Sequence, residues 1–514
     1  MMFPFSRKDG TNSMRGLLLL LPAAIVFCLV LTHCRALSTR PSDPKMTSAL
    51  GQSVIRVNVT RQEYDFLRPW QQRGSSTHTG IGVVIQGPRV LVTSQFMANH
   101  RYIELENVTT GEKSRAELEV VDYEANLALL KSTDPQFLKN SRFLEITTNA
   151  VEGDQLAVWQ VKPNGIVTPV LGVITSIELI RYPHSNYFLT YRLNSSLQYR
   201  FRNFTLPVVK DGSLSGLLMN YDATAQTIDV VAAPVIAHFI EDAADGHYPG
   251  FPLTGLKISS TEDPQLRRYV GISGRTGGVY VEGVIKSSAA EKAGIQKGDI
   301  IFEVEGFSID SRGNFDHPVY GKMALSHLTR CEFHVGDTVT CKIFRDGKDT
   351  SANLILEHRP PEAYLVPPYI IDKAPRYYIL GGLIFQELST SYLQEFGNSW
   401  QVKAPVHLVY YEAFQDALEI NGREKIVFLS GVMPTSYTVG YDQLSGMVVE
   451  RVNDQVISRL EDIPRALEKP VDGFHKIEFE HRPKVIYLDP LEIPKINVQI
   501  QKRYDLPALS NLGE

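Results

Sequence analysis

Short runs rich in β-branched residues follow one another between Ser53 and Ile240, and turn residues separate them. Frequent strands at this spacing are typical of an all-β barrel or sandwich. Residues 233–244 are the exception, because they predict one closing helix. Representative runs are residues 82–85, 89–93, 116–121 and 127–130. This segment therefore predicts a mainly β domain over residues 53–248.

The composition limits the classes of protein that the chain can belong to. It has 514 residues, which corresponds to roughly three domains. The 52 basic and 57 acidic residues give a net charge of −5, so charge makes no case for nucleic-acid binding. Four cysteines in this length exclude a disulfide-rich scaffold.

A basic and then apolar segment opens the chain. Arg7, Lys8 and Arg15 precede an apolar run over residues 16–31, which is the layout of a secretory signal. The run ends at Leu31-Thr32-His33-Cys34, which resembles a bacterial lipobox except for His33. Three readings stay open: a lipoprotein with lipidated Cys34, an uncleaved membrane anchor, or a cleaved signal. Each predicts a chain in the cell envelope, in the periplasm or on the outer surface, with residues 1–34 as the address and 35–52 as a linker.

A different pattern begins at Phe251. Residues 288–294 predict a short helix with a glycine stop, and Gly298-Asp299 leads into a strand over 300–304. Glu305-Gly306 then predicts a tight turn. Residues 447–457 repeat this strand–turn–strand, so we expect two related domains, at 251–358 and 370–489. Residues 359–369 form a proline-rich linker, and 490–514 are a C-terminal extension.

The segment Ser287–Ile301 resembles the most recognisable part of a PDZ domain. The preceding β domain is similar to the trypsin-like domain of HtrA/Deg proteases, through blocks in the family's order at residues 80–85, 124–131, 153–155 and 172–177. Leu380–Phe385 is similar to the plant-type branch. The resemblance implies a trypsin-like double β-barrel, a PDZ domain and a second, diverged PDZ-like domain. It also implies trimer-based homo-oligomers, or hetero-oligomers with an active family member.

The catalytic triad of the family is degenerate in this alignment. The histidine position holds Gln95, the aspartate position holds Asn126, and the best register puts Leu214 at the nucleophile. An amide is no general base near neutral pH, and leucine has no nucleophilic atom. The alternatives are Ser215 as a nucleophile one residue later, and His78 or His100 as a base.

Peptide binding by strand addition is what the resemblance implies for the PDZ domains. By position, Tyr269, Val270, Gly271 and Ile272 are expected to form the carboxylate-binding loop. Met323, Leu325 and Leu328 are expected to line either the groove or the core. In the second domain, Leu380–Leu383 is the equivalent candidate, with a structural role as its alternative.

We expect no metal site and no cofactor. His327, Cys331 and His334 could present ligands, with His317 and Cys341 nearby, but strong zinc patterns pair their ligands more tightly. A disulfide between Cys331 and Cys341 is compatible with an oxidising compartment.

These features favour an envelope-associated pseudoprotease that binds peptide C-termini or unfolded proteins. It would act as a scaffold, a chaperone-like binder or a regulator of an active protease. The alternatives are a serine endopeptidase with residual activity through Ser215 and a surface adhesin or scaffold.

Overall fold

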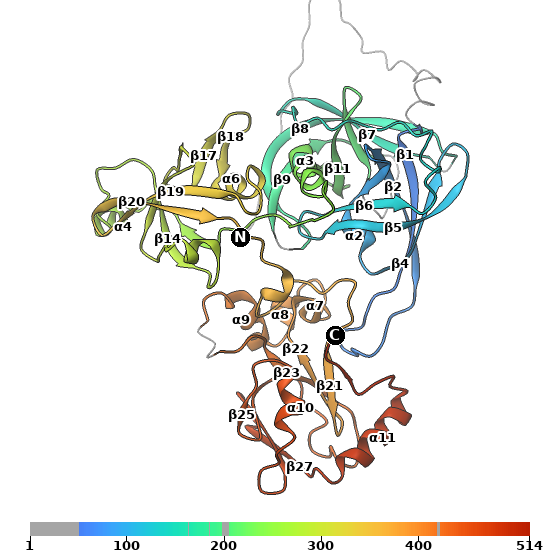
Figure 1. Ribbon diagram of the computed structural model, residues 1–514, viewed down its shortest axis with the longest axis vertical. Coiled ribbons are helices and arrows are strands. Elements are labelled where there is room, and N and C mark those ends of the chain that lie inside the picture. The colour runs from blue at the N-terminus through green and yellow to red at the C-terminus, as the bar shows by residue number, and fades with distance from the viewer. Residues whose placement is uncertain (1–50, 163, 185, 198–204, 419–421, 514) are drawn as a thin grey trace, which may run out of the picture. The chain divides into compact units, whose positions relative to one another are not determined.

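The computed structural model describes residues 51–162, 164–184, 186–197, 205–418 and 422–513. Two closed six-stranded barrels come first, and two further sheets follow them (Figure 1). The predicted mainly β fold with a double barrel is confirmed. The predicted signal and Cys34 lie outside the described residues. Among the described residues, every helix is too short or too polar to cross a membrane.

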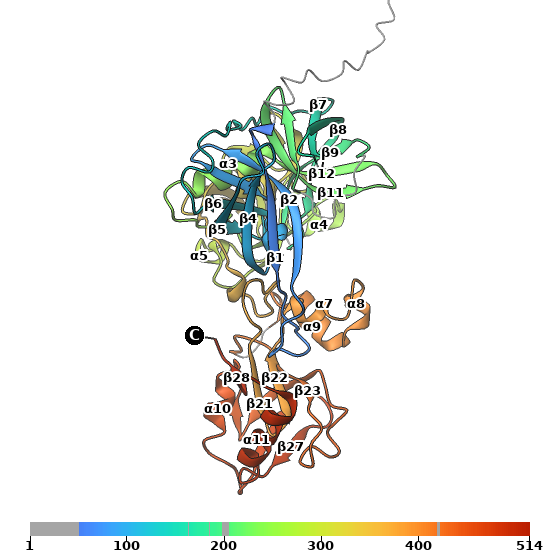
Figure 2. The same ribbon diagram turned by 90° about the vertical axis from the view of Figure 1, so that its right-hand side faces the viewer.

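The first barrel has the strand order β1-β2-β3-β6-β5-β4. Figure 2 shows the long antiparallel pair of β1 and β2 side by side. Gly82 is required in β2 because a Cβ atom there would lie 2.3 Å from Cγ1 of Val90. The strands are β1 Val54–Arg61, β2 Ser76–Ile85, β3 Arg89–Val92, β4 His100–Asn107, β5 Lys113–Asp122 and β6 Leu127–Ser132, and the short helix α2 Ser94–Met97 follows β3.

The second barrel has the strand order β10-β11-β12-β9-β8-β7. The predicted closing helix is confirmed as α3 Ala233–Asp242, which packs against β11 and β12. Its strands are β7 Gln155–Val161, β8 Val167–Arg181, β9 Tyr187–Asn194, β10 Pro207–Lys210, β11 Ser213–Asp222 and β12 Thr227–Ala232.

The third unit of the fold is built around the sheet β13-β14-β15-β19-β20. The predicted short helix is α5, which begins after Ser288, whose Oγ accepts a hydrogen bond from the amide of Glu291. Its strands are β13 Leu256–Ser259, β14 Val279–Val284, β15 Ile300–Val304, β16 Phe307–Ser308, β17 Asn314–His317, β18 Gly321–Ala324, β19 Thr338–Arg345 and β20 Lys348–Ile355. Its helices are α4 Pro264–Tyr269, α5 Ala289–Lys292 and α6 Leu325–Cys331.

The last unit is a sheet with the order β27-β26-β24-β23-β22-β21-β28, and β25 pairs with β24. The C-terminal extension packs onto this unit, because Ile496 and Ile500 of α11 are buried in its core. The strands are β21 Tyr377–Leu380, β22 Leu383–Glu387, β23 Val427–Val432, β24 Met447–Val452, β25 Gln455–Val456, β26 His475–Phe479, β27 Val485–Leu488 and β28 Ser510–Asn511. The helices are the 3-10 turn η1 Pro361–Ala363 before the sheet, α7 Thr390–Gln394, α8 Trp400–Lys403, α9 Val406–Phe414, α10 Asp462–Ala466 and α11 Ile493–Tyr504.

The internal repeat predicted from the sequence is confirmed at the level of a hairpin. Val304 pairs with Phe307, and Val452 pairs with Gln455, so each hairpin turns through two residues. Glu305-Gly306 and Asn453-Asp454 all take positive φ angles, as two-residue hairpin turns of the primed type require. The disulfide considered for Cys331 and Cys341 is wrong, because both residues are free cysteines.

Candidate functional site

Gln95 and Asn126 meet in the first barrel. Gln95 lies in α2, and Asn126 lies in the turn before β6 with a φ of 57°, a left-handed conformation that asparagine tolerates. The backbone amide of Gln95 donates to Oδ1 of Asn126 at 3.0 Å, and Oγ of Ser94 donates to the same oxygen at 3.4 Å. The structure therefore brings together two of the three predicted triad positions.

The Gln95 side chain is held by the second barrel. Its Nε2 donates to the backbone carbonyl of Met219 in β11 at 3.3 Å. An amide nitrogen has no basic lone pair, so Gln95 cannot take a proton from a nucleophile. What this arrangement can do is fix α2 against β11.

Leu214 does not lie beside this pair. It is fully buried on β11, where its amide donates to the carbonyl of Glu145 at 2.7 Å. Met219, which contacts Gln95, is five residues further along the same strand, roughly 16 Å at about 3.3 Å per residue. The assignment of Leu214 to the nucleophile position is therefore wrong.

A hairpin turn explains the error. Lys210 pairs with Ser213, and Asp211 and Gly212 take φ angles of 50° and 87°, so Asp-Gly makes the two-residue turn between β10 and β11. Asp-Gly between apolar runs is among the strongest hairpin signals in a sequence, so the sequence itself indicates this turn. Gly212 therefore belongs to a turn between strands and not to a nucleophile loop.

Thr205, which lies just before β10, also contacts the segment that leads into Gln95. Thr205 is buried, and its Oγ1 accepts from the backbone amide of Thr93 at 3.0 Å, two residues before Gln95. Residues 198–204, which precede Thr205, lie outside the described residues. Thr205, and not Leu214 of β11, thus contacts the segment that leads into Gln95.

The alternative catalytic residues lie apart from one another. Ser215 is 0% exposed, and its Oγ has no hydrogen-bond partner among the described residues. His78 on β2 pairs with Oγ of Ser76 at 2.9 Å, and Nδ1 of His100 lies 3.2 Å from the carbonyl oxygen of Met97. Ser215 is therefore neither open to substrate nor hydrogen-bonded to either histidine.

A buried carboxyl group lies two residues before Asn126. Oε2 of Glu124 accepts from Nδ2 of Asn186 at 2.6 Å, while Oε1 has no hydrogen-bond partner among the described residues. Burial, and next the negative charge of Asp122, raise the pKa of Glu124 above its ordinary value of 4.5. The site thus contains an acid that favours its protonated form.

The predicted carboxylate-binding loop is not at a sheet edge. Tyr269 ends helix α4 and is 86% exposed, while Ile272 is buried. Gly271 takes a φ of 78° beyond the helix, and the Arg267 guanidinium donates to the carbonyls of Ile272 and Gly277. Residues 269–272 therefore form a pinned turn outside every strand, which a peptide cannot join by strand addition.

The two edge strands of this sheet are β13 and β20, and β13 is the one that follows a glycine turn. It pairs with β14 on one side and, among the described residues, with no strand on the other. Gly255 precedes it with a φ of 77°, and a Cβ atom there would lie 2.1 Å from Cβ of Ser288. Met323, Leu325 and Leu328 are buried in the core, so they do not present a groove wall. The β13 edge thus offers a backbone template that an extended peptide could join.

In the last unit, Leu380–Leu383 is a hairpin turn. Leu380 pairs with Leu383, and Gly381 and Gly382 take φ angles of 56° and 105°. The outer edge of β21 is already occupied by β28, through Tyr377 with Asn511 and Tyr378 with Ser510. The structural role of Leu380–Leu383, not the peptide-binding one, matches this geometry.

Comparisons with known proteins agree with this architecture. Family models described as "PDZ domain" match residues 255–356 and residues 366–510. The second match includes the end of the predicted linker at 359–369, the predicted domain at 370–489 and most of the predicted extension at 490–514.

Relatives from Arabidopsis thaliana align along most of the chain. Do-like 3, mitochondrial, is 24% identical, and the match spans 89% of this chain and 79% of the relative. Do-like 12, mitochondrial, is 24% identical, and the match spans 95% of this chain and 94% of the relative. Protease Do-like 2, chloroplastic, is also 24% identical, and the match spans 89% of this chain and 74% of the relative. A solved structure, "HtrA-type protease AlgW with decapeptide", has 16% identity and a TM-score of 0.47 over 61% of this chain and 98% of its own.

Two closed barrels precede two PDZ matches, and relatives named Do-like align over this whole order. The chain belongs to the HtrA/Deg family.

Proposed function

We propose that this protein is a non-catalytic HtrA/Deg protein that binds peptides at the β13 edge of its PDZ domain. The observation that supports the proposal is the hydrogen bond from Nε2 of Gln95 to the carbonyl of Met219, because the resemblance to the family assigns the position of the base to this amide residue. A serine protease needs an imidazole there to accept the proton of the nucleophile.

The sequence near the expected third position supports the same proposal. Between Ser196 and Ser213 the chain contains no serine and no cysteine. The hydroxyl of Thr205, which lies within this stretch, already accepts a hydrogen bond from the backbone amide of Thr93. Neither a base nor a free nucleophile is thus available from the residues named here. One relative carries the name protease, so we attribute the proposed loss of hydrolysis to residues of this chain.

Hydrolysis and peptide capture are tested together on the full-length chain purified in detergent. We expect no cleavage of casein, and we expect fluorescence-labelled peptides with a free C-terminal carboxylate to bind more tightly than the same peptides with an amidated end. Cleavage that a serine-directed inhibitor stops would contradict the loss of catalysis.

The peptide site is tested with two matched glycine substitutions. Gly255→Ala and Gly294→Ala both place a Cβ atom at a positive φ, but only the first meets another side chain, at 2.1 Å. We expect Gly255→Ala to lose peptide affinity and Gly294→Ala to keep it, with thermal unfolding showing that both variants fold. Equal affinities in the two folded variants would place the peptide elsewhere.

Residues 1–34 are proposed to anchor the chain at a membrane of the cell envelope, with Cys34 as the lipid attachment point. The named relatives are mitochondrial or chloroplastic, which makes an organelle the competing destination. Metabolic labelling with a fatty acid distinguishes these cases: we expect label in the wild type and in Cys28→Ala, and none in Cys34→Ala. Label that survives Cys34→Ala would remove the lipoprotein reading.

Assembly is the remaining part of the proposal. Loss of catalysis leaves a scaffold, a chaperone-like binder or a regulator that joins active family members. Light scattering of the purified chain gives the mass of the homo-oligomer, for which we expect a multiple of three. A monomer mass at all concentrations would contradict homo-oligomer formation.

A further inference from the structure

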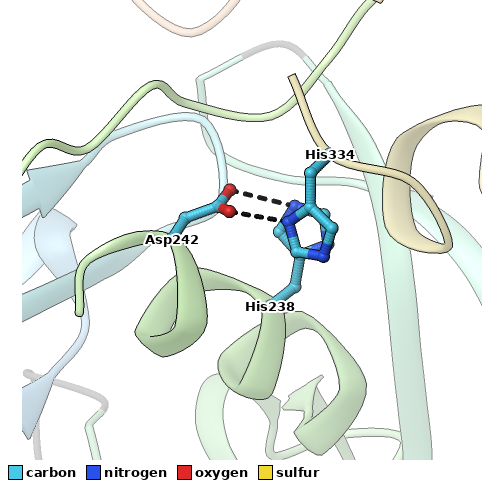
Figure 3. A group of neighbouring side chains, drawn as sticks. All are labelled: His238, Asp242 and His334. Carbon is cyan, nitrogen blue, oxygen red and sulfur yellow. Dashed lines mark hydrogen bonds and ion pairs between the residues drawn. The ribbon is translucent and has the colours of Figure 1, made fainter. Parts of the chain in front are cut away.

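Three ionisable side chains gather where α3 meets the loop that follows α6. His238 and Asp242 lie four residues apart on α3, so they share one face of the helix, and His334 comes from that loop (Figure 3). Nε2 of His238 lies 3.2 Å from Oδ2 of Asp242, and Nδ1 of His334 lies 2.6 Å from Oδ1. One atom of each residue, two nitrogens and one oxygen, can lie within 4.8 Å of the others.

The His238 ring is fixed in position and in tautomer. It is stacked on Phe251 with a centroid distance of 4.5 Å and on His334 with a distance of 4.0 Å. Its Nδ1 lies 3.2 Å from the carbonyl oxygen of Cys331. A carbonyl only accepts hydrogen bonds, so Nδ1 carries the proton and Nε2 of the neutral ring has a free lone pair. Metal-binding histidines are prepared in the same way, with the second ring nitrogen donating to a carbonyl or carboxylate.

The free lone pair faces another acceptor. Nε2 of His238 and Oδ2 of Asp242 are both buried, and neither has a hydrogen-bond partner among the described residues. Two buried acceptors at 3.2 Å are unfavourable unless a cation lies between them or the imidazole takes up a second proton. Their separation suits coordination, because two ligands about 2.0–2.1 Å from a tetrahedral Zn²⁺ are roughly 3.3 Å apart.

His334 gives access and the third ligand. Its side chain is 33% exposed, whereas the side chains of His238 and Asp242 are 3% and 8% exposed. The planes of the two stacked rings differ by only 17°, and each nitrogen lone pair lies in the plane of its ring, so the partly exposed His334 ring must turn about its Cβ–Cγ bond to direct Nδ1 at a shared ion.

We propose that His238, Asp242 and His334 form a binding site for a divalent cation of zinc type. The ligands are Nε2 of His238, a carboxylate oxygen of Asp242 and Nδ1 of His334, with water in the fourth position. Two imidazoles and one carboxylate are a donor set that Zn²⁺ accepts. A bound ion would tie α3 of the second barrel to the PDZ domain, since His334 lies between α6 and β19.

A second group of similar composition lacks a histidine whose free lone pair faces the other ligands. His317, His327 and Glu332 also gather, but Nδ1 of His317 accepts from the amides of Val319 and Tyr320 at 3.1 Å each. The neutral His317 ring therefore carries its proton on Nε2, the nitrogen that faces Glu332 at 3.5 Å, and has no lone pair for a metal there. His317 is thus a matched control within the same domain.

The test uses the full-length chain, purified in detergent and treated with a chelator. Co²⁺ is added as a probe, and the visible absorption of tetrahedral Co²⁺ is recorded, followed by displacement with Zn²⁺. We expect one equivalent of Co²⁺ per chain, and a melting temperature that rises with Zn²⁺. His334→Gln and Asp242→Asn should weaken binding by about 100-fold or more, because losing even a supporting partner of a ligand costs about 10–100-fold.

His317→Gln should bind Co²⁺ as the wild type does. His334→Gln alters the most exposed ligand, so its fold is expected to survive, and its melting curve without metal checks this. The absence of a tetrahedral Co²⁺ spectrum in the wild type would overturn the proposal. The three side chains would then be joined by hydrogen bonds and ion pairs without a metal. Wild-type affinity in a folded His334→Gln variant would overturn it equally.

Discussion

The side-chain amide of Gln95 reaches from the first barrel to the carbonyl oxygen of Met219 in the second, at 3.3 Å. A base in an active protease has to leave such a place free to exchange protons with its nucleophile. Here the hydrogen bond joins α2 to β11, so we expect substitutions in this region to change stability and not hydrolysis.

Restoring the histidine and aspartate alone should not restore hydrolysis. The double variant Gln95→His with Asn126→Asp recreates a base and its orienting carboxylate, but the chain between Ser196 and Ser213 still contains no serine or cysteine. We expect casein cleavage at the background rate of the buffer. Turnover well above that background would mean that a hydroxyl elsewhere serves as the nucleophile.

Leu214 should behave as a core residue. Because it is fully buried in the second barrel, Leu214→Ala should lower the free energy of unfolding by about 2–5 kcal/mol. Leu171→Ala is the matched control, because Leu171 is 58% exposed and its truncation should change stability by about 0.5 kcal/mol or less. Urea denaturation of both variants gives the comparison. Similar losses in the two would show that Leu214 is not in the core.

Ser215→Ala should be neutral or slightly stabilising. The Ser215 Oγ is buried without a hydrogen-bond partner among the described residues, so its removal ends a desolvation cost of about 1–3 kcal/mol. Casein assays of wild type and variant should be identical. A cleavage activity that disappears in Ser215→Ala would instead identify this serine as a nucleophile.

Glu124 should make stability fall as the pH rises. Its pKa is raised in the folded chain, so above its ordinary value of 4.5 the unfolded chain loses this proton while the folded chain keeps it. The contribution of Glu124 is therefore fully present below 4.5 and is lost as the pH rises through the folded value.

Glu124→Gln removes that titration, so the variant should gain stability relative to the wild type between about pH 5 and pH 8. The control is Glu119→Gln, because Glu119 is exposed on β5. Thermal unfolding at several pH values measures the difference. A difference between wild type and Glu124→Gln that does not change with pH would contradict the raised pKa.

The local patterns of the sequence predicted the fold well. Runs of β-branched residues became the barrel strands, and the hairpin turns at Glu305-Gly306 and Asn453-Asp454 follow from positive φ angles that these residue types tolerate. The predictions of strands and turns needed only interactions between residues close in sequence. The meeting of Gln95 with Asn126, 31 positions apart, was instead implied by the resemblance to the HtrA/Deg family.

The site could not be completed in the same way, because its remaining parts depend on long-range pairing. The Leu214 assignment failed since a glycine in the Asp211-Gly212 turn was taken for a glycine of the nucleophile loop. The edge position of β13 is a property of sheet order, not of its own residues. His334 meets Asp242 from a position 92 residues away, which no local spacing rule reveals.

The pairing of β28 with β21 determines the stoichiometry of peptide binding. A sheet edge can accept only one additional strand on a given side, and the chain itself supplies that strand to the second domain. The β21 edge is thus closed to an added peptide, and with β13 as the template that we propose, a peptide titration of the full-length chain should saturate at a single equivalent per subunit.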